Sequence, residues 1–171
     1  AVLHLRSAHK VFCAGADLQL IRSSITTPQG LDRMLATVQA MQRVFARLEQ
    51  LPCLTLAELG GATLGGGFEL ALACDLRLVS ESARIGLPEA RLGLLPAAGG
   101  TQRMTRICGE AVARRLILGA ELVGGEEAVK LGLAQWSAPS EKIEAAARAL
   151  AGRIADLPAA TLAACKRCID V

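Results

Sequence analysis

The stretch TLGGGFELALACD, residues 63–75, places three consecutive glycines directly before a short apolar segment that contains one glutamate. Three residues of high backbone freedom in a row let the chain pass close to another group. Residues 68–74 are almost wholly apolar and predict a short, buried helix. The unpaired N–H groups at the start of such a helix favour an anion or an oxyanion.

Two interpretations of these glycines are open from the residues alone: a binding site, or a helix packed tightly on a strand. A phosphate-binding loop would add Lys and then Ser or Thr after the glycines, and a dinucleotide site would need G-x-G-x-x-G. Leu70 stands where the last glycine of that second motif would fall. Both phosphate-binding motifs are therefore absent from this stretch.

Two glutamates are the candidate titratable groups. Glu69 has only apolar neighbours in the sequence, which predicts a raised pKa. The alternative for Glu69 is an acid stabilised by the helix dipole. Glu89 follows IGLP, residues 85–88, and its alternative is an ion pair with Arg91 or Arg103. Spacing does not bring the two glutamates together, because a strand and a proline-containing turn lie between them.

Outward from this stretch, apolar periodicity predicts alternating strands and helices. Thr27 and Pro28 begin a long helix, whose apolar face holds Leu31, Met34, Leu35, Val38, Met41, Phe45 and Leu48. Strands are expected at 2–5, 54–59, 76–79 and 133–136, and further helices at 101–107, 110–118 and 126–131. Ser140 caps a helix with Ile143, Ala147, Leu150 and Ile154 on one side, and Pro158 begins another with Leu162, Cys165 and Ile169 on one face. This alternation predicts an α/β fold with a parallel sheet and a carboxy-terminal helical layer.

The composition bounds the function. The chain has 171 residues, 52% of them hydrophobic, which fits one domain with a large core. The net charge of +3 comes from dispersed Arg and Lys, and aromatics make up only 2%, so nucleic acid is not expected as a partner and an anionic small molecule is still open. The longest uncharged run, residues 92–102, is far below the ~20 residues of a membrane span.

Six cysteines lack the spacing of a disulfide framework and predict a reducing compartment. Cys165 and Cys168 have CxxC spacing, but no second pair of ligands accompanies them, so we expect helix packing there and no metal site.

Read in order, FCAGADL (12–18), LGGGFELALACD (64–75) and GLPEARLGLLPAAGGTQR (86–103) closely resemble the crotonase, or enoyl-CoA hydratase/isomerase, superfamily. The resemblance covers nearly the whole chain and implies a crotonase-like spiral of ββα units with parallel sheet layers. It implies a single crotonase-like domain over 1–171, with a spiral core at 1–138 and the start of a helical trimerisation region at 139–171. It also leads us to expect further strands and a helix before Val2, and further helices after Val171, in a complete family member.

The resemblance gives the residues of the motifs specific roles. The backbone N–H groups of Ala16 and Gly66 would form an oxyanion hole for a thioester oxygen, each donor worth about 3–4 kcal/mol in the transition state. Glu69 would take a proton from water and Glu89 would deliver one to the substrate. The substrate-binding positions would be Ala14, Asp17, Leu18, Gln19, Gly65, Pro88 and Ala97. Gln19 stands where relatives often carry Lys, and Ala97 where hydratases frequently carry glycine.

The function implied is hydration of a 2-trans-enoyl-CoA, with coenzyme A as part of the substrate and no separate cofactor. The alternatives are double-bond isomerisation, hydration of a branched or methylglutaconyl-type acyl-CoA, or a non-catalytic binding module that has kept the fold. Relatives assemble as trimers or pairs of trimers, which implies a homo-oligomer. The Arg-rich, Lys-poor composition favours the bacterial cytoplasm, with the mitochondrial matrix as the expectation for a eukaryotic protein.

Overall fold

A four-stranded parallel sheet forms the centre of the computed structural model, which describes residues 1–169. Its strand order is β1-β2-β4-β7, and every neighbouring pair is parallel. The strands are β1 (Val2–Leu5), β2 (Leu54–Leu59), β4 (Leu76–Ser80) and β7 (Trp136–Ala138). A small second sheet has the order β3-β5-β6 and consists of β3 (Thr63–Leu64), β5 (Arg84–Gly86) and β6 (Val123–Gly124).

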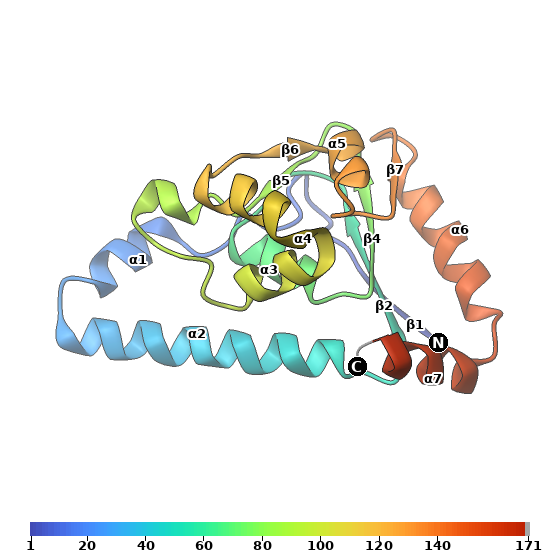
Figure 1. Cartoon of the computed structure of the whole chain (residues 1–171), viewed down its shortest axis with the longest axis horizontal. Helices are drawn as coiled ribbons and strands as arrows, with labels where there is room; N and C mark the ends of the chain where they lie inside the picture. The colour runs from blue at the N-terminus through green and yellow to red at the C-terminus, as the bar shows by residue number, and fades with distance from the viewer. Residues whose placement is uncertain (170–171) are drawn as a thin grey trace.

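Helices cover the central sheet on both faces (Figure 1). They are α1 (Leu18–Ser24), α2 (Pro28–Glu49), α3 (Gly66–Leu72), the 3-10 helix η1 (Glu89–Leu92), α4 (Gly100–Leu118), α5 (Gly125–Lys130), α6 (Ile143–Ala155) and α7 (Ala159–Ile169). These elements confirm the predicted α/β fold with parallel sheet layers and a carboxy-terminal helical layer.

The alternation of side chains along the strands creates two separate cores. Leu56 and Leu78 face α6 and pack with its buried side chains. Leu59 and Val79 point to the other face, where they pack with Phe68 of α3 and with residues of α4. Helix α3, which carries one of the two glutamates, is therefore held firmly between the sheet and α4.

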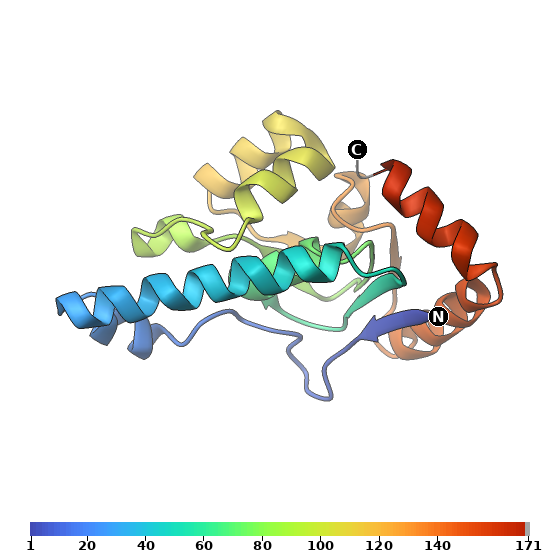
Figure 2. The same ribbon diagram turned by 90° about the horizontal axis from the view of Figure 1, so that it is seen from below.

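Helix α2 begins where the sequence predicts. The Thr27 side chain accepts a hydrogen bond from the Gly30 N–H at 3.1 Å, and Pro28 is the first helical residue. The predicted apolar face is only partly covered: Phe45 is buried, but Leu31 and Leu35 are 50% and 57% exposed. The first half of α2 extends past the rest of the chain with α1 alongside it (Figures 1 and 2).

Several predicted boundaries are wrong. The last strand is Trp136–Ala138, because Leu133 and Ala134 belong to the buried turn after α5. Ser140 does not cap α6, which begins at Ile143; its hydroxyl contacts the Ser80 and Ser82 hydroxyls instead. The helix expected at 68–74 begins earlier, at Gly66, so two of the three glycines lie inside its first turn.

Helix α7 packs by a different face from the one predicted. Cys165 and Ile169 are exposed and Leu162 is half-buried, whereas Lys166 is buried. The sequence also does not predict α1 or the three short strands of the second sheet, whose two- and three-residue lengths carry no periodicity. Over residues 1–169, no helix has the length and apolar character needed to cross a membrane.

Candidate active site

The three-glycine turn holds the candidate active site. Gly65 lies just before α3 with φ +54°, in the left-handed region that favours glycine, and its carbonyl accepts from the N–H groups of Phe68 and Glu69. A Cβ at Gly65 would lie 3.1 Å from Glu89 Oε1, in crowded contact with that carboxylate. Glycine at 65 therefore serves both the turn and the close approach of a glutamate from η1.

The loop of the first motif packs directly against these glycines. Cys13 and Thr63 form an isolated parallel bridge, and the Leu64 N–H donates to the Cys13 carbonyl at 2.9 Å. At Gly15, φ is +89° and a Cβ would lie 3.3 Å from the Gly66 nitrogen. The structure thus brings CAGAD and GGG together across about fifty residues of sequence.

The two amides of the predicted oxyanion hole are available to a ligand. Between residues 1 and 169, neither the Ala16 nor the Gly66 N–H donates a hydrogen bond to another protein group. Gly66 is the first residue of α3, where N–H groups have no partner within the helix. These amides are the kind of donors that can stabilise a developing negative charge on oxygen.

Glu69 is a buried carboxyl with a backbone partner. Its side chain is buried, and Oε1 accepts from the Gly100 N–H of α4 at 2.8 Å. Burial raises the pKa of Glu69, against the lowering effect of the N–H groups of Gly100 and Ala98 and of the nearby Arg103 charge. The predicted raised pKa is confirmed, and the hydrogen bond to α4 disfavours the interpretation of Glu69 as a mere helix-dipole acid.

Glu89 has fewer hydrogen-bond partners for its carboxyl than Glu69. Its Oε2 is buried and, among residues 1–169, has no hydrogen-bond partner. Burial, helped by the charge of Glu69, raises the pKa of Glu89 to about 7. The ion-pair interpretation of Glu89 is wrong, because Arg91 donates to the Ala120 carbonyl at 2.6 Å and Arg103 pairs with Glu49.

The two carboxylates approach consecutive glycines. Glu89 Oε1 lies beside the Cβ position of Gly65, and Glu69 Oε2 lies 3.9 Å from that of Gly66. The site therefore combines two free amides with the buried carboxyl of Glu69 and the half-buried carboxyl of Glu89. These unequal environments allow one carboxyl to act as base and the other as acid.

The other predicted substrate-binding residues lie around this centre. Ala14 and Ala16 are exposed in the loop before α1, where Leu18 and Gln19 are also exposed. The Asp17 side chain caps α1 by accepting from the Gln19 and Leu20 N–H groups. Pro88 directly precedes Glu89. Contact of these residues with a substrate stays a prediction.

Ala97 is half-buried, and its carbonyl accepts from Gln42 Nε2 at 2.7 Å. Sequence reasoning did not identify Gly100, which binds Glu69, or Met41, whose Cε lies 3.0 Å from the Cβ position of Gly66. No local pattern marks either residue, since each acts on a segment far away in the sequence.

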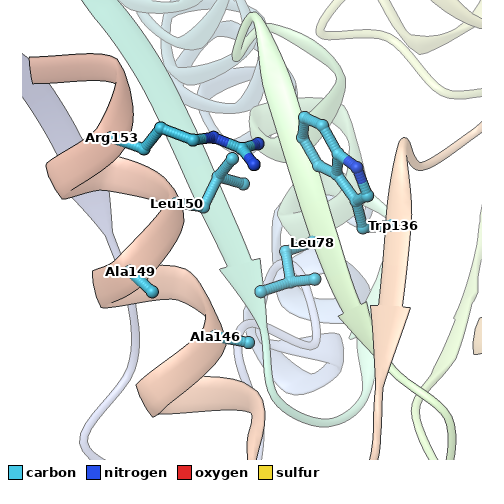
Figure 3. Close-up of a pocket in the computed structure, with 6 residues that line it drawn as sticks. All are labelled: Leu78, Trp136, Ala146, Ala149, Leu150 and Arg153. Atoms are coloured by element: carbon cyan, nitrogen blue, oxygen red, sulfur yellow. The ribbon is translucent and has the colours of Figure 1, made fainter.

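Two grooves are lined by neither Glu69 nor Glu89. One, of about 340 Å³, lies between α6 and strands β4 and β7, where Trp136 and Arg153 extend over Leu78 and Leu150 (Figure 3). The other, of about 580 Å³, lies between α2 and residues 95–106. In residues 1–169, no three His, Cys, Asp or Glu side chains are grouped to hold a metal ion.

The comparison with known proteins identifies the family of the chain. Residues 1–170 match the family described as enoyl-CoA hydratase/isomerase. The chain belongs to this family. Enoyl-CoA hydratase domain-containing protein 2, mitochondrial, from Bos taurus is 44% identical over 167 residues, which is 95% of this chain and 54% of that protein.

Two further members of the enoyl-CoA hydratase/isomerase family are similar. The methylglutaconyl-CoA hydratase of Rattus norvegicus mitochondria is 42% identical over 123 residues, or 72% of this chain and 38% of that protein. The crystal structure of an enoyl-CoA hydratase from Bacillus anthracis has a TM-score of 0.90 and 35% identity, covering 99% of this chain and 64% of that one. The chain spans about half the length of the curated relatives it matches.

Proposed function

We propose that the protein adds water to the double bond of 2-trans-enoyl-CoA thioesters and forms 3-hydroxyacyl-CoA. The observation that carries the proposal is the pair of carboxyls beside Gly65 and Gly66, of which Glu69 is buried and Glu89, half-buried, has a pKa of about 7. A pair with one ionised and one protonated member suits a reaction that removes one proton and delivers another.

In the proposed reaction the thioester oxygen accepts from the Ala16 and Gly66 N–H groups. The Glu69 carboxylate takes a proton from a water molecule as the water oxygen bonds to C3, and the electron pair of the double bond moves toward the thioester as an enolate. The two amides stabilise the enolate oxygen. Glu89 then donates its proton to C2, and proton exchange between the carboxyls and water restores the starting state.

Replacing either carboxyl tests this assignment. We expect Glu69→Gln and Glu89→Gln each to lower kcat by about 10²- to 10⁴-fold, because each removes a proton-transfer group. The loss of absorbance of the conjugated enoyl thioester measures the rate. Glu81→Gln is the matched control, since Glu81 is exposed, and it should keep the wild-type rate. Undiminished hydration by Glu89→Gln would contradict the role of Glu89 as acid.

A branched acyl-CoA is the second candidate substrate, favoured by the similarity to the rat methylglutaconyl-CoA hydratase. Product analysis with straight 2-enoyl, branched 2-enoyl and 3-enoyl thioesters distinguishes the reactions. A hydroxy product from only the branched substrate identifies a branched-chain hydratase, and conversion of the 3-enoyl substrate to its 2-enoyl isomer identifies an isomerase. Salt-dependent RNA binding without affinity for acyl-CoA would instead support a non-catalytic module.

A further inference from the structure

The loop at residues 97–100 separates the carboxyl pair from the groove beside α2. On the inner side, the Gly100 N–H donates to Glu69 Oε1 at 2.8 Å. On the outer side, the loop carbonyls accept from two other elements: Ala97 from Gln42 of α2 at 2.7 Å, and Ala98 from Arg103 of α4 at 2.9 Å. The loop that binds Glu69 is thus held in place by side chains that do not contact Glu69 through a hydrogen bond.

Arg103 is itself fixed by a two-pronged ion pair. Its Nε and Nη2 donate to the two carboxylate oxygens of Glu49, the last residue of α2, at 2.8 and 2.6 Å. Only 11% of the Arg103 side chain is exposed. A Cβ at Gly99, where φ is +104°, would collide with Arg103 Nη1, so the guanidinium lies directly against the loop. This planar, paired geometry is one that lysine cannot reproduce.

The charges around Glu69 come from two elements. Glu89 approaches from η1, and Arg103 contributes the positive charge from α4. The side chain that α2 places near Gly66 is the neutral Met41, and strand β3 supplies only Thr63 and Leu64. Burial raises the pKa of both carboxyls, but only at Glu69 do the Gly100 and Ala98 N–H groups and, to a smaller extent, the Arg103 charge act against that rise.

We propose that Arg103, held by Glu49, is a positioning residue for Glu69. It anchors the loop that binds the Glu69 carboxylate, through its hydrogen bond to the Ala98 carbonyl, and adds a positive charge on the side of Glu69. The inference rests on the proposed function for its catalytic consequence: Arg103 helps to keep Glu69 in place and ionised, as the proposed base must be.

The test compares Arg103→Gln, Arg103→Lys and the control Arg115→Gln in the full-length protein. Arg115 lies on the same helix but pairs with Glu121 and Glu127 at the surface. A nearby cation favours the ionised carboxyl. In Arg103→Gln we therefore expect the acidic limb of the pH profile of kcat/KM to shift to higher pH by about 0.5 to 1 unit. Arg103→Lys keeps the charge but not the paired guanidinium geometry, so the acidic limb of its pH profile should stay near the wild-type position while kcat falls. Arg115→Gln should match the wild type in both the position of the limb and kcat.

A second readout does not depend on activity. The carboxyl carbon of Glu69, labelled with ¹³C and assigned by its loss in Glu69→Gln, should titrate at higher pH in Arg103→Gln than in the wild type. If the wild-type protein hydrates no enoyl-CoA, the proposed function fails while this titration still tests Arg103. A folded Arg103→Gln variant with the wild-type Glu69 titration would overturn the inference and leave Arg103 a purely structural residue.

Discussion

Glu89 is a carboxyl that the fold keeps in an unfavourable environment. It has a buried oxygen without a partner and a pKa raised from 4.5 to about 7 by burial and by Glu69. Between these pH values the folded state binds more protons than the unfolded state, so stability falls as pH rises. The loss of stability caused by ionising Glu89 in the folded state is absent below about pH 4.5 and complete above about pH 7.

Replacing Glu89 with Gln should therefore stabilise the protein at alkaline pH while it removes activity. At pH 8 we expect the free energy of unfolding to rise by about 1–2 kcal/mol, a value reduced for partial solvent screening. Near pH 4.5 the difference should almost vanish. Urea titrations at both pH values measure it, with Glu81→Gln as the unaffected control. A Glu89→Gln variant no more stable at pH 8 than at pH 4.5, relative to wild type, would contradict this account.

At the scale of elements, α7 depends on one buried cation. Lys166 Nζ lies 2.9 Å from Asp75 Oδ2, and that same oxygen accepts from the N–H and hydroxyl of Thr55. The Lys166 side chain is 7% exposed. This ion pair therefore attaches the helix to the starts of β2 and β4, whereas the apolar pattern predicted an attachment through Leu162, Cys165 and Ile169.

Removing this cation should weaken the fold. Lys166→Ala leaves Asp75 without its cation in a largely buried position, so we expect a loss of about 2–4 kcal/mol in the free energy of unfolding. Chemical denaturation measures the loss. Lys130→Ala is the matched control, because Lys130 ends α5 in an exposed position. Equal stabilities of the two variants would show that the Lys166 to Asp75 pair contributes nothing.

At the scale of the whole molecule, the end formed by α1 and the first half of α2 has an exposed apolar surface. Helix α1 and the first half of α2 extend outward, with Leu20, Leu31 and Leu35 at least half exposed (Figure 2). An exposed group of large apolar side chains is typical of a surface that another part of an assembly covers. This surface and the family resemblance both favour a homo-oligomer.

We expect the full-length protein to have three or six times the mass of one chain. Light scattering after size exclusion measures the mass, and a dilution series distinguishes a stable assembly from weak association. A mass equal to one chain at every concentration up to about 100 μM would contradict this prediction.

Prediction from the sequence succeeds where local pattern decides the structure. The period of α2, its start at Thr27 and Pro28, and the strands at 2–5 and 54–59 all follow from near neighbours. Errors occur where a distant group decides. Lys166 is buried because Asp75 lies across from it, ninety-one residues away in the chain. The short strands of the second sheet form because Gly65, Thr63 and Ile85 pair with distant backbone.

The sequence by itself determined the family, the order of the three motifs and the identity of both glutamates, because these depend on residue type and spacing. Only the tertiary structure decided that Glu89 lies over Gly65, that Glu69 binds α4 and that Arg103 faces Glu49 instead of Glu89. The physical reason is that a carboxyl's charge state depends on burial and on partners from other elements, and the spacing of residues along a chain specifies neither.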